Sequence, residues 1–319
     1  GVMAEGQGHG LGDEGLDHMH SNLAGLVGGD IDDDGLRSGA FQCRDDLPQR
    51  IGTVGCSGSG GLAEFRQSHV IQPVDGSGSF QQEVEDAAHV GGGIGQGAAD
   101  HDLVLLARTT TDLDELASVL GEETGAQVRT CAVDLTDDEA LAVAVGELNL
   151  TQLDVLVNSA GVEAAGPVEE LSPARWRSVL DLDLVAVAHL TGLLLPALRE
   201  TRGLVIMINS GAGLRAWPEQ ALYCSAKAGL KALADSLREE ERSRVRVTTI
   251  YPGRVDTPMQ RRIQQNKSRR LRAEGSKPRR YRAADHMTTT SVAATVRLAV
   301  DMPTDAVVED LSIRPADML

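Results

Sequence analysis

The sequence has few aromatic residues, few cysteines and few basic residues, and each shortage narrows the classes of protein it can encode. Aromatic side chains make up 3% of the 319 residues, so any core must be built from leucine, valine, isoleucine and alanine. The formal net charge of −17 argues against nucleic acid as the main partner. Hydrophobic residues still reach 41%, which suffices for one large or two modest folded domains.

The cysteines and the apolar runs point to a reduced, cytoplasmic protein without membrane contact. No CxxC spacing and no histidine partners at zinc spacing occur, so neither a metal site nor a disulfide framework is expected. The start of the chain lacks the order of a signal peptide, and its first residue, Gly, indicates a fragment or a processed product. The longest apolar run, near 190–198, is too short to span a bilayer. The cysteines are Cys43, Cys56, Cys131 and Cys224.

Residues 1–98 differ from the rest of the chain. They hold 23 of the 35 glycines, and the first 100 residues carry 16 acidic but 4 basic residues. Helical or strand periodicity is missing, and few large apolar residues offset the entropy cost of ordering so much glycine. We expect this segment to be disordered. A second interpretation is that it is not native, because a shifted reading frame in a GC-rich gene gives such a composition; the coding DNA distinguishes the two.

From His101 onward, apolar runs of strand length alternate with segments of helical spacing. The expected strands are 103–107, 128–133, 153–157, 204–208, 245–250 and 306–313. The expected helices are 111–120, 137–148, 173–198 in two parts, 223–238 and 291–300. Continuous apolar strands are typical of a parallel sheet that is covered on both faces. The pattern therefore predicts a doubly wound, Rossmann-like α/β domain over residues 99–319.

An ordered set of motifs lies within this domain. Tyr223 and Lys227, in Tyr-Cys-Ser-Ala-Lys, are four residues apart on a predicted helix and therefore share one face. Ser210 precedes Tyr223 by 13 positions, Pro252-Gly253 follows, and Asn-Ser-Ala-Gly stands at 158–161. This set resembles the short-chain dehydrogenase/reductase family over about residues 100–315. The resemblance implies an NAD(P)-dependent oxidoreductase that acts on a small carbonyl or alcohol, in a homo-dimer or homo-tetramer.

Four residues are the expected catalytic group. An ammonium beside a phenol favours the phenolate, so Lys227 would tune Tyr223 as the acid/base. By resemblance, Ser210 positions the substrate oxygen, and Lys227 also holds the nicotinamide ribose. Asp183 stands where the family usually has Asn; an ionised carboxylate accepts hydrogen bonds but cannot donate them. Asp183 is therefore a site residue whose catalytic competence is open.

The resemblance also implies which residues hold the cofactor. Arg108 directly follows the second expected strand, where an arginine favours the additional phosphate of NADP and an aspartate favours NAD. NADP is therefore expected, with NAD as the alternative; a solvated strand-end arginine is the simpler interpretation of Arg108. The expected cofactor-binding residues are Arg108, Asp134, Leu135, Asn158, Ala160, Gly161, Tyr223, Lys227, Pro252, Gly253, Val255 and Thr257.

The family's first strand and the glycine-rich loop that follows it are not recognisable. Gly91–Gly95 keeps a Gly-Ile-Gly ending, but no apolar strand precedes it. Gly58–Ala63 fits a G-x-G-x-x-A pattern, with Asp75 at the distance of a ribose-binding acid, but its strand is poor. Loss of the first strand would leave unpaired ladder groups inside the sheet.

The segment Gln260–Arg282 carries ten basic residues and occupies the place of the family's substrate lid. It is either a solvated lid or a surface that attracts an acidic substrate or the cofactor's phosphates. The first functional hypothesis is an NADP(H)-dependent carbonyl reductase or alcohol dehydrogenase. Two alternatives remain because of Asp183 and the unrecognised glycine loop. These are a non-catalytic relative that binds cofactor or a partner, and an inactive product of a misread gene.

Overall fold

The computed structural model describes residues 68–71, 102–278 and 280–316, all within one compact unit, Gly52–Leu319. Its described strands form a seven-stranded sheet in the order β3-β2-β1-β4-β5-β6-β7, with every neighbouring pair parallel. The strands are β1 Ser68–Ile71, β2 Asp102–Ala107, β3 Val128–Ala132, β4 Val155–Asn158, β5 Leu204–Ile208, β6 Arg246–Pro252 and β7 Asp310–Ile313. This order confirms the predicted doubly wound α/β fold.

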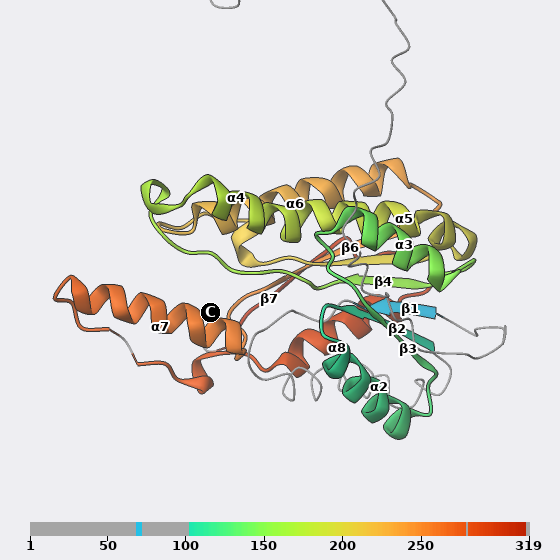
Figure 1. Ribbon diagram of the computed structural model, residues 1–319, viewed down its shortest axis with the longest axis horizontal. Helices are drawn as coiled ribbons and strands as arrows, with labels where there is room; N and C mark the ends of the chain where they lie inside the picture. Colours follow the sequence, from blue (N-terminus) through green and yellow to red (C-terminus); the bar gives the residue numbers. More distant parts are fainter. Residues whose placement is uncertain (1–67, 72–101, 279, 317–319) are drawn as a thin grey trace, which may run out of the picture. The chain divides into compact units, whose positions relative to one another are not determined.

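Helices cover both faces of the sheet (Figure 1). Helices α3, α4, α5 and α6 lie on one face, and α2 and α8 lie on the other. The helices are α2 Thr110–Thr124, α3 Asp138–Leu148, α4 Pro173–Leu180, α5 Ala186–Thr201, α6 Ala221–Glu240, α7 Pro258–Ala273 and α8 Thr289–Val300. Helix α7, drawn in orange, projects beyond the end of the sheet and does not pack on either of its faces with the other helices. The basic segment after Pro252-Gly253 is therefore largely a helix.

The first strand, which was not recognisable in the sequence, is present and lies within the segment 1–98 that we expected to be disordered. Ser68–Ile71 pairs in parallel with both β2 and β4, so the interior slot of the sheet is filled. A phosphate loop of this fold follows the first strand, and Gly58–Ala63 precedes it, so that candidate is wrong. Gly91–Gly95 and Asp75 follow β1 but lie outside the described residues, as does the rest of 1–98.

The core is aliphatic, as the shortage of aromatic residues requires. Its largest cluster joins β2, β4, β5 and β6 to α3, α5 and α6. Leu190, Leu194 and Leu198 recur every four residues on α5 and are at most 2% exposed. The helical stretch Pro173–Thr201, with a hydropathy of 1.7, is long and apolar enough for a membrane span by length and composition. Its buried leucines pack against the sheet, which accounts for that composition.

The long helical segment predicted in two parts is interrupted at one point. Helix α4 begins after Ser172, whose hydroxyl oxygen accepts a hydrogen bond from Arg175 N at 3.2 Å, with Pro173 at the first helical position. A π-helical turn, Asp181–Val185, then separates α4 from α5. Such single-turn bulges re-aim side chains and are frequent at functional sites. Here the bulge carries Asp183, which is buried.

Candidate active site

The residues predicted for the site follow the carboxyl ends of the parallel strands. Arg108 follows β2, Asp134 follows β3, Asn158 ends β4, Ser210 follows β5 and Pro252 ends β6. Because these strands are parallel, all five residues lie along one edge of the sheet. The strand order reverses between β1 and β4, and open α/β sheets bind ligands at such a switch point.

Asp183 and Lys227 form a buried ion pair beside Tyr223. Lys227 Nζ lies 3.1 Å from Asp183 Oδ2, and the two side chains are 5% and 0% exposed. Asp183 Oδ1 accepts a hydrogen bond from Val162 N at 2.7 Å. Lys227 Nζ also lies 5.7 Å from the centre of the Tyr223 ring. Asp183, which stands where the family usually has asparagine, thus supplies the counter-charge of Lys227.

Burial and charge shift the pKa values of all three groups. Burial raises the pKa of the Asp183 carboxyl, against the opposing effect of Lys227. Burial acts to lower the pKa of Lys227, but Asp183 and the Tyr223 phenol outweigh it and raise that pKa. Burial, and then Asp183, also raise the pKa of Tyr223 although Lys227 lowers it. Lys227 therefore acts in the expected direction, but the net effect keeps the phenol protonated at neutral pH.

Ser210 lies against the phenol of Tyr223. It lies close enough to Tyr223 to lower the pKa of the phenol, and its Oγ accepts a hydrogen bond from Ala212 N at 3.2 Å. That bond caps the short 3₁₀ turn Gly211–Gly213. The hydroxyls of Ser210 and Tyr223 are therefore neighbours in the site. A carbonyl oxygen placed there could accept a hydrogen bond from each.

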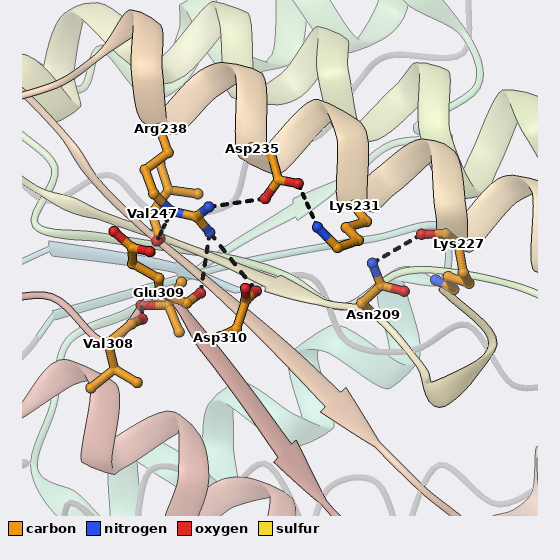
Figure 2. Close-up of polar contacts among 10 residues, drawn as sticks. Asn209, Lys227, Lys231, Asp235, Arg238, Val247, Val308, Glu309 and Asp310 are labelled. Carbon is orange, nitrogen blue, oxygen red and sulfur yellow. Dashed lines mark hydrogen bonds and ion pairs between the residues drawn. The ribbon is translucent and has the colours of Figure 1, made fainter. Parts of the chain in front are cut away.

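Asn209 joins the strand that carries Ser210 to the helix that carries Lys227, a contact that the sequence analysis missed. Its Oδ1 accepts a hydrogen bond from Ser210 N at 2.8 Å, and its Nδ2 donates to the Lys227 carbonyl oxygen at 3.0 Å. Figure 2 shows this bond at the carboxyl end of β5. A Cβ at position 213 would lie 2.5 Å from Asn209 Oδ1, so Gly213 leaves room for the amide. The Asn-Ser pair at a strand end was the available sequence signal.

Arg238 fixes the other end of α6 to the sheet (Figure 2). Its Nε donates to the Val247 carbonyl oxygen at 3.2 Å and its Nη2 donates to the Glu309 carbonyl oxygen at 3.2 Å. Its Nη1 also donates to Asp235 Oδ1 at 2.9 Å. Asn209 and Arg238 thus fix α6 to the sheet at two separate points, and the helix holds Tyr223 and Lys227 over the strand ends.

Small residues after β4 leave room for the ion pair. A Cβ at position 161 would lie 3.0 Å from Asp183 Oδ2 and 3.3 Å from Lys227 Nζ, which explains Gly161. Ala160 is buried beside it. Asn158 uses its side chain within the fold, since its Nδ2 donates to Thr191 Oγ1 at 3.2 Å. In the segment 158–161, the backbone and not the Asn158 side chain is therefore available to a ligand at the end of β4.

Asp134 and Arg108 lie close enough for their charges to interact. Asp134 Oδ1 accepts hydrogen bonds from the backbone N and the Oγ1 of Thr136, at 2.9 and 2.7 Å. Partial burial acts to raise the pKa of Asp134, but the Thr136 bonds and the Arg108 charge lower it below its usual range. Leu135 points into the core, so only its backbone is available to a ligand.

The loop after β6 is fixed by backbone pairing. Gly253 N donates to the Ile313 carbonyl oxygen at 2.8 Å, and a Cβ at 253 would lie 3.2 Å from that oxygen. Val255 pairs with Met287 in an isolated parallel bridge. Thr257 Oγ1 accepts a hydrogen bond from Gln260 N at 3.2 Å and so caps α7. Its hydroxyl hydrogen remains a potential donor.

A cavity of about 320 Å³ opens between the loop that follows β4, the residues just before α6 and one face of α7. Glu163 lies on its wall, and within the described residues its Oε1 is buried without a hydrogen-bond partner. Burial raises the pKa of Glu163, against the opposing charges of Arg175 and Arg262. Gln220, which lines the cavity just before α6, is three residues before Tyr223. This cavity was not predictable from the sequence because its walls come from three separate segments.

Comparison with known proteins identifies the class. Residues 91–268 match the family model described as short chain dehydrogenase, a match that contains Gly91–Gly95. An uncharacterized oxidoreductase of Staphylococcus saprophyticus is 30% identical over 190 residues, or 56% of this chain and 81% of that protein. The chain belongs to the short-chain dehydrogenase/reductase family and is an oxidoreductase, which confirms the resemblance drawn from its motifs.

Particular relatives differ in how much of their length is matched. The 3-oxoacyl-acyl-carrier-protein reductase FabG of Chlamydia trachomatis is 31% identical over 154 residues, or 47% of this chain and 62% of that protein. An alcohol dehydrogenase of Thermococcus sibiricus, solved with 5-hydroxy-NADP, superposes with a TM-score of 0.63 at 24% identity. That superposition covers 78% of this chain and 97% of the other. At this identity, the structural likeness supports the fold alone.

Proposed function

We propose that the protein interconverts a carbonyl and an alcohol with NADP(H), and that Tyr223 is the acid/base. In reduction, Tyr223 gives its phenolic proton to the carbonyl oxygen while Ser210 donates a hydrogen bond to the same oxygen. NADPH, when bound, supplies the hydride that the carbonyl carbon accepts. The product is the alcohol, and oxidation runs the same steps in reverse.

The observation that carries this proposal is the buried Asp183–Lys227 ion pair beside the half-buried side chains of Tyr223 and Ser210. Tyr223 is protonated at neutral pH, as a proton donor must be. Once it has donated, the ammonium 5.7 Å from its ring centre stabilises the phenolate. Asp183 raises the pKa of Lys227, so the ammonium keeps its charge in a buried position. Asp183, which stands where the family usually has asparagine, therefore keeps Lys227 charged through a direct ion pair.

The residues at the strand ends suit a dinucleotide cofactor. A Cβ at Gly161 would lie 3.0 Å from Asp183 Oδ2 and a Cβ at Gly253 would lie 3.2 Å from the Ile313 carbonyl oxygen, so glycine keeps the backbone at both strand ends free of side chains. The Val255 backbone and the Thr257 hydroxyl would hold the carboxamide and the phosphates, and Asp134 with the Leu135 backbone would contact the adenine ring. Arg108 offers a fork of charged donors to the additional phosphate of NADP, which supports NADP over NAD. NAD is the alternative, because the charge of Arg108 also interacts with Asp134 and lowers the pKa of that carboxyl.

The test is NADPH oxidation with a panel of aldehydes, ketones and keto acids, followed by absorbance. The proposal predicts carbonyl-dependent oxidation with at least one class and a corresponding alcohol product. The panel should be run with purified full-length protein and with a boiled control. No turnover with any carbonyl, in either direction, would contradict the proposal.

A non-catalytic relative is the second candidate, and the raised pKa of Tyr223 favours it. Burial, with Asp183 adding to its effect, raises the pKa of Tyr223, and a protonated phenol is a poorer base for alcohol oxidation than the phenolate that Lys227 favours. Calorimetric titration with NADPH separates the two candidates. Clear binding without hydride transfer to any carbonyl supports the non-catalytic relative, whereas binding with turnover supports the enzyme.

A further inference from the structure

One face of α7 supplies a basic wall to the cavity that Glu163 and Gln220 also line. Ile263, Asn266, Lys267 and Arg270 recur at three-, four- and seven-residue spacing and so form one stripe of the helix, and Arg269 borders it. Between Pro258 and Ala273 the helix carries six basic and no acidic residues. The cavity therefore has a positively charged wall that is built into one rigid element.

Two of these charges are uncompensated. Arg270 Nη2 pairs with Glu170 Oε2 at 3.0 Å, which uses its charge to fix the helix to the loop before α4. Lys267 and Arg269 are exposed, and no acidic partner is found for either among the residues that the structure describes. Their charges at the cavity wall are available to a ligand.

The opposite wall carries charge of the other sign. Glu163 and Glu219 line it, and Glu163 lies close enough to Tyr223 for its charge to raise the pKa of the phenol. An anion near Tyr223 would be repelled by Glu163, whereas an anion near α7 would be attracted by Lys267 and Arg269. The cavity is thus polarised, and its polarity sets the direction in which a charged substrate binds.

The cofactor's own phosphates do not account for these two charges. Lys267 and Arg269 lie about 15–18 Å along the helix from Thr257, at the rise of an α-helix. Val255 and Thr257 are the residues proposed to hold the carboxamide and the phosphates, and Arg108, after β2, is proposed to hold the additional phosphate of NADP. The basic wall of α7 faces the cavity that Gln220, three residues before Tyr223, also lines, and the proposed substrate would lie there.

From this geometry we infer that the substrate carries a carboxylate or phosphate, separated from its reacting carbonyl by several bonds. The anionic group binds Lys267 and Arg269 on α7, and Glu163 keeps it away from the carbonyl end. This assignment rests on the proposed carbonyl–alcohol chemistry and deepens it. A cavity of about 320 Å³ is at the small end of ligand pockets, which points to a compact substrate.

The test uses matched pairs of carbonyl compounds with NADPH. The carboxylate pair is levulinate and methyl levulinate, and the phosphate pair is dihydroxyacetone phosphate and dihydroxyacetone. We expect the anionic member of at least one pair to have the higher kcat/KM, by about tenfold or more at low salt, and the preference to shrink as salt is added. The pair that shows the preference identifies the anionic group. Both anions are also tested as competitive inhibitors of a neutral carbonyl that the enzyme reduces.

Three charge-reversal variants on α7 test the basic wall, and one of them is the control. Arg269→Glu should lower the anion-to-neutral ratio of kcat/KM by about three- to tenfold, and Lys267→Glu/Arg269→Glu should lower it further. Arg272→Glu makes the same charge change on the side of α7 away from the cavity and should leave the ratio unchanged. Equal losses in Arg269→Glu and Arg272→Glu would overturn the assignment.

The two proposals fail in different ways. If neutral carbonyls are reduced and the anions neither react nor inhibit, the substrate assignment is overturned while the proposed function stands. If no carbonyl of any kind is reduced, the proposed function fails and the substrate assignment fails with it.

Discussion

Replacing Lys227 by methionine would leave Asp183 buried without its counter-charge. The charged atoms are 3.1 Å apart, and at an effective dielectric constant of about 20 their attraction is about 5 kcal/mol. Loss of one partner of a buried pair costs about 3–5 kcal/mol. We expect Lys227→Met to lower the free energy of unfolding by that amount at neutral pH. For a domain of this size, each kcal/mol lowers Tm by about 2–4 °C.

The loss of stability caused by Lys227→Met should depend on pH. Burial raises the pKa of Asp183, and Lys227 is the charge that opposes this rise, so the variant raises it further. An acid whose folded pKa lies above its unfolded value destabilises the fold as it ionises. The penalty of Lys227→Met should therefore be smallest below the unfolded value of about 4 and should grow as pH rises through the raised folded pKa.

Thermal unfolding followed by circular dichroism, from acidic to neutral pH, measures both effects. Lys227→Met/Asp183→Asn is the matched control, because asparagine removes the charge but can still accept the hydrogen bond from Val162 N. This double variant should regain most of the lost stability, and its difference from the parent should vary little with pH. The reasoning is refuted if Lys227→Met is as stable as the parent at neutral pH, or if the double variant is no more stable than the single one.

Three further substitutions test the surroundings of the site. Asn209→Ala leaves the Ser210 N–H without its side-chain acceptor and the Lys227 carbonyl without its donor; it should cost about 1–3 kcal/mol and lower kcat more than it raises KM. Gly161→Ala places a methyl group against Asp183 and Lys227 and should cost about 1–3 kcal/mol by thermal unfolding, with a fall in kcat; unchanged kcat would speak against it. Arg108→Asp should shift the ratio of kcat/KM for NADPH to NADH toward NADH by about tenfold or more, and an unchanged ratio would remove Arg108 from the phosphate site.

Continuous apolar strands and strongly periodic helices were predictable from the sequence. Strand β5 matches its predicted span, Leu204–Ile208, and α6 extends its predicted span by two residues at each end. Strand β1 was not predictable because Ser68–Ile71 has only two apolar residues, and its place is set by pairing with β2 and β4. Helix α7 was not recognised because it buries no residue and lacks the apolar stripe of a core helix.

The site was predictable where a motif names its residues, and not where the fold brings separate segments together. Spacing alone placed Tyr223 and Lys227 on one helix face, and the structure places Asp183 against Lys227. The direct ion pair depends on a π-helical turn, a local irregularity that periodicity does not reveal. The bridge made by Asn209 and the charged walls of the cavity depend on tertiary contacts between distant segments.

The central claim is that Tyr223 transfers the proton in carbonyl reduction, and Tyr223→Phe tests it most directly. The variant removes one hydroxyl and keeps the ring that packs beside Lys227, so its NADPH affinity and Tm should remain near those of the parent. The account predicts that single-turnover hydride transfer from NADPH to a carbonyl falls by about a hundredfold or more. Hydride transfer at the parent's rate in a folded, NADPH-bound Tyr223→Phe would contradict it.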